Sequence, residues 1–517
     1  MTDNPYIFFI GYPWDVHNQV ERSLASNTLI NDRTVKVGIY CDGKSEHLRS
    51  CCEVTKNIAN DEQRMMNCSC CLQHKKNFFR NSFDKEINLS DGSNSHCIQD
   101  LANLEYKNMS EIEQRMIISP VLSDTRTSST TEAMIYLGEE NYMKIFEKYL
   151  YSTYEVQNQF LGCLQSLGIS RNHPLYIFTY NGRFHPYQAI LNIAKREKYQ
   201  CIIHERGSLP NNWKVVKNHI PYDVKALTRF VDKYEERINL VALSQFTVKI
   251  SLKKFMSDRI KYGQNNFLDF VGTKTINTKA FNTIQSIKNQ KVAFFTSSLD
   301  EVAILDKTFT YQNQLKQIVL AAKECQQYNW KLIVRHHPNL GTIGSPTEAN
   351  IFIDAVNEQA EIYGFDVISP AEECAWSFLA ARVNLNIVPY SSMLLDMMYF
   401  GFPCSTIGIV QWYGSIILDK KQVWIPQAKN LREASKAAQY RLFSKTQWRR
   451  TLFYAYIYYL GCCLSIPYAN IKDTYFIDPN YNTPNRHDNV RLEKLLLFIK
   501  NIDGFPLPLA SQQKQAN

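Results

Sequence analysis

The sequence predicts an α/β protein built from two Rossmann-like domains. Short apolar segments with the length of buried strands alternate with segments whose apolar residues recur at helical spacing, which is typical of βαβ units around a parallel sheet. The chain has 517 residues, more than one ordinary hydrophobic core accommodates. Hydrophobic residues make up 45% of the chain and charged residues 21%, as in globular proteins.

The first half of the chain contains five short apolar runs that predict strands. They lie at 6–10, 34–40, 175–180, 200–204 and 238–243. Helices are expected at 18–29, at 140–166, after Pro186 and from the last of these strands to about 260. Between 43 and 130 the alternation stops, and a polar segment rich in Cys, Asn and Ser predicts an irregular, partly disordered insertion.

The second half alternates more regularly. Strands are expected at 292–295, 331–334, 366–369 and 383–388. Helices are expected at 348–363, 373–381 and 391–400, and around the apolar face formed by Leu315, Ile318, Ala322 and Cys325. The predicted organisation is an N-terminal domain at 1–262 that carries the insertion, a linker at 263–290, a C-terminal domain at 291–430 and a helical tail at 431–517.

Charge and cysteine content restrict the class of partner and the compartment. The net charge of +9 suits an anionic substrate or membrane surface, and without a long basic block it does not indicate nucleic acid. No secretory signal is visible and the chain has 14 cysteines, so reduced thiols and a cytoplasmic location are expected. The apolar stretch 451–466 is shorter than the roughly 20 residues of a membrane-spanning helix. It predicts a buried helix or, alternatively, a peripheral contact with the inner face of the plasma membrane.

Two predicted strands of the C-terminal domain end in groups that bind phosphate. Arg335 and His337 follow one apolar run, and Pro338 fixes the turn that aims His337 away from the sheet. Ser391 and Ser392 stand where the next helix begins, where hydroxyls and unpaired backbone N–H groups favour an anion. Because ligands of open α/β sheets bind beyond the carboxyl ends of the strands, these ends predict one phosphate site. A solvated strand end and a simple helix cap are the structural alternatives.

Three further residues of this domain are weaker candidates. Ser297 and Ser298 follow another strand and suit a phosphate or a ribose, although a plain turn explains them equally well. Asp396 lies one helical turn after Ser392 and suits a ribose hydroxyl. Its position near a helix N-terminus is also favourable for structural reasons alone.

The N-terminal domain offers a candidate catalytic base. Glu205 follows a predicted strand, and its carboxylate is suited to accept a proton from a sugar hydroxyl. Asn181 and Arg183 end a neighbouring strand and are candidates for binding the acceptor or the donor. A structural salt bridge between Glu205 and an arginine is the alternative.

The cysteines and histidines between 51 and 97 do not predict a metal centre. Their spacing lacks the Cys-x2-Cys and His-x3-His pairs of zinc sites. The chain also lacks the glycine-rich loops of P-loop ATPases and of NAD-binding domains. Neither a metal nor a cofactor is therefore predicted.

The chain resembles the GT-B-fold glycosyltransferases of capsule and surface polysaccharide biosynthesis. The resemblance rests on three motifs, Arg335-His336-His337-Pro338, Tyr390-Ser391-Ser392 and Gly401-Phe402-Pro403. Capsule Kdo transferases, bacterial polysialyltransferases and CDP-glycerol glycerophosphotransferases are similar in the same places. In those enzymes a His-Pro and a Ser-Ser motif hold the nucleotide phosphates, which implies that role for His337, Ser391 and Ser392. The acidic-acidic-Gly motif that supplies the base is matched only in part by Glu205-Arg206-Gly207.

This resemblance implies two Rossmann-like domains facing a cleft, with the acceptor on the N-terminal domain and the nucleotide on the C-terminal one. The expected function is metal-independent transfer of a sugar from a nucleotide-sugar donor, CMP- or CDP-linked, to a surface polysaccharide or glycolipid acceptor. A CDP-glycerol-type glycerophosphotransferase is the enzymatic alternative. A non-catalytic GT-B-like scaffold that binds glycans is the alternative of another class.

Overall fold

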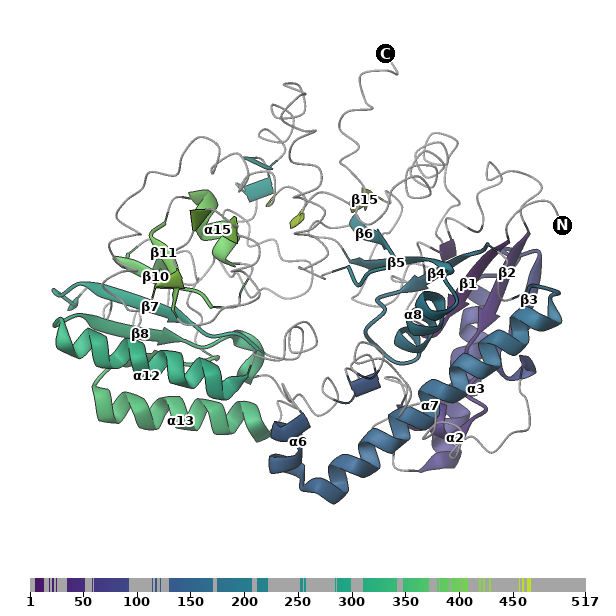
Figure 1. The fold of residues 1–517 in the computed structure, drawn as a ribbon, viewed down its shortest axis with the longest axis horizontal. Helices are drawn as coiled ribbons and strands as arrows, with labels where there is room; N and C mark the ends of the chain where they lie inside the picture. The colour runs from purple at the N-terminus through teal and green to yellow at the C-terminus, as the bar shows by residue number, and fades with distance from the viewer. Residues whose placement is uncertain are drawn as a thin grey trace, which may run out of the picture. The chain divides into compact units, whose positions relative to one another are not determined.

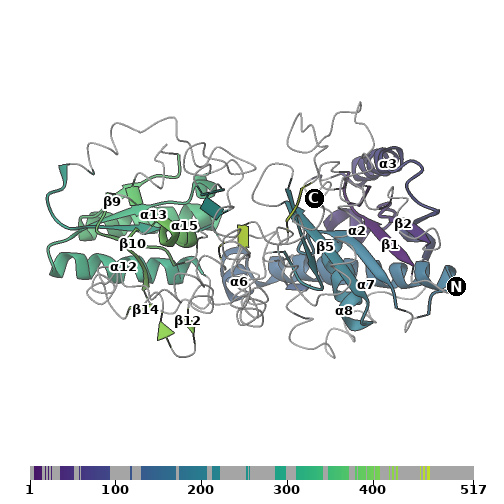
Figure 2. The same ribbon diagram turned by 90° about the horizontal axis from the view of Figure 1, so that it is seen from above.

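The computed structural model contains two α/β units, each built around a largely parallel sheet (Figures 1 and 2). It describes residues 5–13, 35–51, 60–92, 130–170, 174–206, 212–221, 286–298, 310–341, 347–371, 382–389, 393–400 and 402–407, together with single residues and short pieces between and after these ranges. Unit 1 comprises Met1–Val121, Leu137–Asp223 and Gly461–Pro508, and unit 2 comprises Leu122–Tyr136, Val224–Leu460 and Leu509–Asn517.

Unit 1 has a seven-stranded sheet in the order β15-β6-β5-β4-β1-β2-β3. The strands from β3 to β5 are parallel, and β6 and β15 add antiparallel edges. Its strands are β1 Tyr6–Ile10, β2 Lys36–Tyr40, β3 Lys85–Asn88, β4 Tyr176–Tyr180, β5 Gln200–Arg206, β6 Asn212–Lys217 and β15 Cys463–Ser465. Its helices are α2 Glu46–Cys51, α3 Asp61–Phe78, the 3-10 turn η1 Leu89–Gly92, α7 Glu139–Ser166 and α8 Tyr187–Arg196.

The long helix α7 packs on η1, α2 and α8 (Figure 1). Gly162 of α7 and Gly92 of η1 meet at their backbones, since a Cβ on Gly162 would lie 2.0 Å from the carbonyl oxygen of Gly92. The helix buries an aromatic and aliphatic face that includes Tyr149, Phe160 and Leu164. This packing fixes the helix that later anchors the loop after β4.

Unit 2 has a six-stranded, wholly parallel sheet in the order β14-β11-β10-β7-β8-β9. Its strands are β7 Lys291–Phe295, β8 Lys331–Arg335, β9 Asp366–Ile368, β10 Leu385–Ile387, β11 Cys404–Ile407 and β14 Gln427–Ala428, and β12 Leu418–Asp419 pairs separately with β13 Gln422–Val423. Its helices are α12 Tyr311–Gln327, α13 Thr347–Tyr363, α15 Met393–Phe400 and the 3-10 turn η2 Pro338–Gly341, while α6 Thr130–Leu137 precedes α7.

Both sheets begin at their centre. In unit 2 the chain runs outward from β7 to β8 and β9, then crosses back to β10 on the other side of β7 and continues to β11 and β14. Unit 1 follows the same course from β1 to β2 and β3, then to β4 and β5. This is the doubly wound order in which ligands bind where the direction reverses. The predicted α/β class with two Rossmann-like units is confirmed.

Part of the predicted irregular insertion at 43–130 is regular. It contributes α2, α3 and the third strand of the unit 1 sheet, β3. Helix α3 is polar around its whole circumference and Lys75 is its only buried residue, so it shows no apolar periodicity. The sequence pattern also gave no sign of β6, which pairs antiparallel with β5.

Several predicted elements lie wholly or mostly outside the described residues. They are the helices at 18–29 and 373–381, the strand at 238–243, the helix that follows it, most of the linker and most of the tail. Within the described part of the tail, Ala455, Tyr458 and Tyr459 are helical, whereas Cys463–Ser465 form β15. None of the helices in the part of the chain that the structure describes has the length and apolar character needed to cross a bilayer.

Candidate functional site

The carboxyl ends of β10, β7 and β8 lie next to one another in unit 2, at the point where the chain reverses direction. Polar residues follow all three strands. Thr296 to Ser298 follow β7, Arg335 ends β8 and is followed by His336 and His337, and Ser391 follows β10. The topology therefore brings together residues that are far apart in the sequence, at the edge where doubly wound sheets bind ligands.

His337 is tied to the end of the neighbouring strand. Its backbone N–H donates to the hydroxyl of Thr296 over 2.9 Å, and the backbone N–H of Thr296 donates to the carbonyl of Arg335 over 3.0 Å. The carbonyl of His337 in turn accepts from the N–H of Leu340 in η2 over 3.0 Å. These bonds fix the backbone on both sides of His337. Its half-buried imidazole therefore extends from a fixed backbone position.

The residue before it has a different environment. His336 is 1% exposed and its ring meets Phe352 of α13 edge-on, with centroids 5.8 Å apart. Neither ring nitrogen has a hydrogen-bond partner. Burial lowers the pKa of His336 to about 4, so the ring is neutral near pH 7. Arg335 is also buried, at 6% exposed.

A buried glutamine holds the loop after β7. Ser297 and Ser298 are both buried. The backbone N–H of Ser297 donates to Oε1 of Gln314 over 2.9 Å, and Nε2 of Gln314 donates back to the Ser297 carbonyl over 3.1 Å. Gln314 lies in the first turn of α12, which Thr310 caps by accepting from the N–H of Asn313. Gln314 was not among the predicted site residues, and its only signal in the sequence is its place beside the apolar face of this helix.

Ser391 caps α15. Its hydroxyl accepts from the N–H of Met393 over 3.3 Å and its carbonyl from the N–H of Leu394 over 3.0 Å. Ser392 lies outside the described residues. Asp396 is fully buried, and its Oδ1 accepts from the hydroxyl of Tyr459 over 2.7 Å. This carboxylate thus links α15 to the tail, and its predicted ribose contact stays a prediction.

In unit 1 the ends of β4 and β5 bring Asn181 and Glu205 together. Asn181 follows β4 in the left-handed region, with φ of 55°, and Glu205 is the penultimate residue of β5. The Asn181 amide donates to the Glu205 carboxylate, and its Oδ1 accepts from the backbone N–H of Arg183 over 2.8 Å. Both side chains are buried, at 1% and 7% exposed. Arg183 is half-buried, with its guanidinium 5.5 Å from the ring centre of Phe184.

Tyr180 is a third member of this group, and it was not among the predicted site residues. Burial raises the pKa of Tyr180 well above its usual value, and the neighbouring Glu205 raises it further. The phenol therefore stays protonated and can donate the hydrogen bond that it shares with Glu205. Glu205 thus has two neutral hydrogen-bond donors beside it, Asn181 and Tyr180.

The loop after β4 is anchored at its far end by His185. Its Nε2 lies 2.7 Å from the hydroxyl of Ser152 on α7, and its carbonyl accepts from the hydroxyl of Tyr12, which follows β1. Burial lowers the pKa of His185 to about 3, so this ring too is neutral. The anchored loop fixes Asn181, and through it Glu205.

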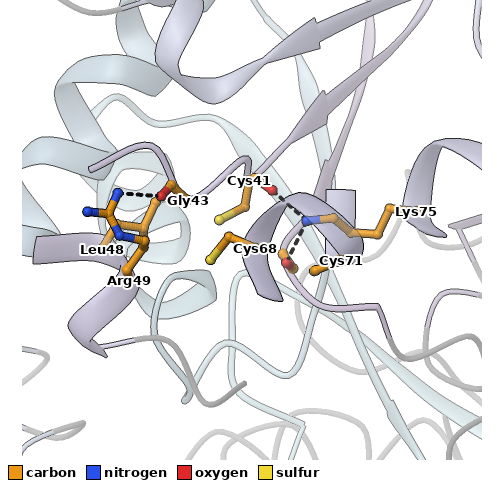
Figure 3. Close-up of a pocket in the computed structure, with 8 residues that line it drawn as sticks. Cys41, Gly43, Leu48, Arg49, Cys68, Cys71 and Lys75 are labelled. Carbon is orange, nitrogen blue, oxygen red and sulfur yellow. Dashed lines mark hydrogen bonds between the residues drawn. The ribbon is translucent and has the colours of Figure 1, made fainter. Parts of the chain in front are cut away.

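The ends of β1 and β2 are occupied by a lysine from α3. Lys75 is fully buried, and its Nζ donates to the carbonyls of Gly11 over 2.9 Å and Cys41 over 2.5 Å (Figure 3). The cavity beside it measures about 10 Å³. That volume accommodates about one water molecule.

Cys51, Cys68, Cys70, Cys71 and His74 of the Cys/His-rich segment are described, whereas Cys52, His96 and Cys97 are not. Among the residues that the structure describes, no three His, Cys, Asp or Glu side chains are grouped so that they could hold a metal ion. No disulfide joins the cysteines whose side chains the structure describes.

Comparison with known proteins gives distant structural likenesses. No protein-family model matches the chain, and no curated protein matches it. The UDP-GlcNAc 2-epimerase of Methanocaldococcus jannaschii, solved with UDP-GlcNAc and UDP, is 11% identical and aligns with 96% of this chain and 99% of its own, at a TM-score of 0.29. The beta Kdo 2,4 transferase KpsC of Thermosulfurimonas dismutans is 14% identical over 51% of this chain and 78% of its own, at 0.31. A glycosyltransferase of Rickettsia africae is 7% identical over 89% and 95%, at 0.27. At these TM-scores the likenesses do not identify the reaction.

Proposed function

We propose that this protein is a glycosyltransferase that moves a sugar from a CMP- or CDP-linked donor to a surface polysaccharide or glycolipid acceptor. One observation carries the proposal. The neighbouring strands β10, β7 and β8 of a doubly wound sheet end in Ser391, in Ser297 and Ser298, and in Arg335 and His337. This collection of donors stands at the edge where such sheets bind ligands, and its chemistry suits a phosphate.

The donor phosphates would be held by His337 and by the start of α15. The backbone N–H groups of the first helical turn and the hydroxyls of Ser391 and Ser392 donate to anions, and the helix dipole favours negative charge there. When the bond from the sugar to the phosphate breaks, charge develops on the leaving phosphate, and donors that are already oriented stabilise it. Because protein groups supply this stabilisation, we expect transfer to proceed without a metal ion.

Glu205 would act as the base. The acceptor hydroxyl passes its proton to the Glu205 carboxylate as its oxygen attacks the anomeric carbon, and the nucleotide leaves with the electrons of the broken bond. Asn181 and Tyr180 support this role because both hydrogen-bond to Glu205. The half-buried Arg183 is suited to bind the acceptor. A cleft between the two units stays a prediction.

Nucleotide binding tests the proposal directly. The full-length protein is titrated with CMP, CDP, UDP and GDP, and thermal stabilisation and calorimetric affinity are measured. We expect a cytidine nucleotide to bind best and His337→Ala to weaken its binding about tenfold or more, the loss of one charge-assisted hydrogen bond. His74→Ala, which removes a half-buried histidine of unit 1, is the matched control and should bind like wild type. Equal affinity of His337→Ala and wild type would refute the phosphate role.

Two alternatives give different results in the same experiments. A glycerophosphotransferase would also bind CDP, but it would release CMP from CDP-glycerol rather than a nucleotide from a sugar donor. A non-catalytic glycan-binding scaffold would bind none of the four nucleotides. The three strand ends of unit 2 favour the enzyme, because their donors suit a phosphate and a scaffold for neutral glycans has no phosphate to bind.

A further inference from the structure

The small cavity at the ends of β1 and β2 is lined by three thiols. Cys41 directly follows β2, and Cys68 and Cys71 lie on α3 in the same cavity wall as Lys75 (Figure 3). This cluster belongs to unit 1 and is separate from the strand ends of the proposed transferase site. It needs an explanation of its own, because the proposed reaction uses none of these residues.

The cations beside the thiols are already engaged. Lys75 donates to the carbonyls of Ile10, Gly11 and Cys41 at 3.5, 2.9 and 2.5 Å. Arg49 forms a forked pair with Asp61 at 3.1 and 2.7 Å, and it also donates to the carbonyls of Gly43 and Lys44. Neither cation is therefore poised to bind an anionic ligand. The chemistry that this cavity offers is that of sulfur in a positive field.

Cys41 and Cys68 are the pair that face one another. Figure 3 shows the two sulfur atoms directed into the same space, and the Cys41 thiol interacts electrostatically with both Cys71 and Cys68. The turn after β2 is shaped around Cys68, since a Cβ on Gly43 would lie 2.4 Å from the Cys68 sulfur. Glycine also suits this position because its φ is 63°. The turn thus holds the Cys68 sulfur close to the end of β2.

The two thiols differ in access. Cys68 is half-buried, whereas Cys41 is 6% exposed. Burial raises the pKa of the Cys41 thiol to about 12, and the nearby Lys75 only partly offsets this. Cys68 is therefore the thiol that a solute reaches, and Cys41 is a protonated partner behind it.

We infer that Cys68 and Cys41 form an oxidation site that closes into a disulfide in the presence of a hydroperoxide. The Cys68 thiolate attacks the peroxide oxygen, which breaks the O–O bond, oxidises Cys68 to a sulfenic acid and releases water or an alcohol. The Cys41 sulfur then attacks the sulfenic sulfur, its proton leaves with the hydroxyl as water, and an S–S bond forms. The product ties α3 to the end of β2, beside Lys75.

Peptide mapping of the full-length protein tests this inference without any assay of transfer. The protein is treated with hydrogen peroxide, the remaining thiols are alkylated under denaturing conditions, and unreduced peptides are identified by mass spectrometry. The expected product is a peptide pair joined through Cys41 and Cys68 that dithiothreitol separates. Because Cys68 is the more accessible thiol of the pair, loss of its thiol should precede the cross-link. Because the thiolate is the attacking form, the cross-link should form faster as the pH is raised.

Matched variants locate the pair. Cys68→Ser should abolish the cross-link, whereas Cys70→Ser, which removes the exposed neighbour on the same helix, should keep it. Cys71→Ser should keep it as well. The inference is overturned if wild-type Cys41 remains open to alkylation after oxidation, or if Cys68 is found joined to Cys71 or to a second chain. The wild-type map decides the question even if a variant fails to fold.

Discussion

His336 gives unit 2 a pH dependence whose size follows from its burial. Its pKa falls from 6.5 to about 4 in the folded protein. As the pH drops below about 6.5 the unfolded chain binds a proton at this ring, whereas the folded chain does not until about pH 4. The contribution of the neutral ring to the free energy of unfolding is therefore fully present above pH 6.5, and it is lost as the pH falls towards 4. At about 1.4 kcal/mol per pH unit, the loss between pH 6.5 and 5 is about 2 kcal/mol.

His336→Phe isolates this effect. The substitution keeps an aromatic ring against Phe352 and removes two nitrogens that have no hydrogen-bond partner, so the variant should be at least as stable as wild type at pH 7.5. At pH 5 it should exceed wild type by about 2 kcal/mol more than at pH 7.5, because phenylalanine does not titrate.

Hydrogen exchange in increasing urea, followed on the peptide at 331–340, measures the opening free energy of this strand apart from unit 1. His74→Phe, on helix α3 of the other unit, controls for the loss of one histidine from the unfolded chain. If the opening free energies of wild type and His336→Phe change by the same amount between pH 7.5 and 5, the pKa of the buried ring is not lowered by its environment, and the reasoning fails.

Two further predictions concern the stability of unit 1. Hydrogen exchange in increasing urea, followed on peptides of unit 1, measures both. Lys75→Met should destabilise unit 1 by about 4 kcal/mol, because it leaves the buried carbonyls of Gly11 and Cys41 without their donor, at about 1–3 kcal/mol each. Lys76→Met, the neighbouring control whose Nζ lies 6.0 Å from the Tyr40 ring, should cost less than about 1 kcal/mol, and equal losses would refute the role of Lys75. Gly162→Ala should cost about 3 kcal/mol despite the helix preference of alanine, because its methyl group meets the backbone of Gly92 at 2.0 Å. Gly168→Ala, with no atom within 4 Å and a φ of 73°, should cost only about 1 kcal/mol, so a milder effect at Gly162 than at Gly168 would contradict the close packing.

The predictable part of the fold is the part whose periodicity is strong. Strands β1, β4, β7 and β8 are apolar runs that end in polar residues, and their observed bounds differ from those predicted by at most one residue. Helix α3 could not be predicted because its sequence is polar on every face and only a lysine is buried. Strand β15 could not be predicted because its partner β6 is about 250 residues earlier, and such pairing leaves no local pattern.

The candidate site also has a part that the sequence predicts and a part that it does not. Residue type and position at a strand end made Glu205, Asn181 and His337 candidates, because polar side chains at strand ends are visible in sequence. Their supporting partners are set by tertiary packing and leave no such mark. Gln314 braces Ser297 from a helix, and Tyr180 reaches Glu205 from the adjacent strand. For Asp396 the sequence showed a carboxylate suited to a ribose but not its tertiary partner. The structure buries this carboxylate against Tyr459, which follows it by 63 residues.

The two units share one strand order, yet their strand ends are filled differently, and this difference supports assigning the nucleotide to unit 2. In unit 1 the ends of β1 and β2 are closed by the Lys75 ammonium, which uses the backbone carbonyls as its ligands. The ammonium is held there by three backbone acceptors, and the cavity beside it measures about 10 Å³. In unit 2 the equivalent ends of β7 and β8 are joined by Thr296, whose hydroxyl accepts from the N–H of His337 and whose own N–H donates to the carbonyl of Arg335. The half-buried His337 ring lies beside this turn. Lys75→Met should therefore lower the stability of unit 1 without creating nucleotide affinity, while His337→Ala should remove affinity at little cost in stability.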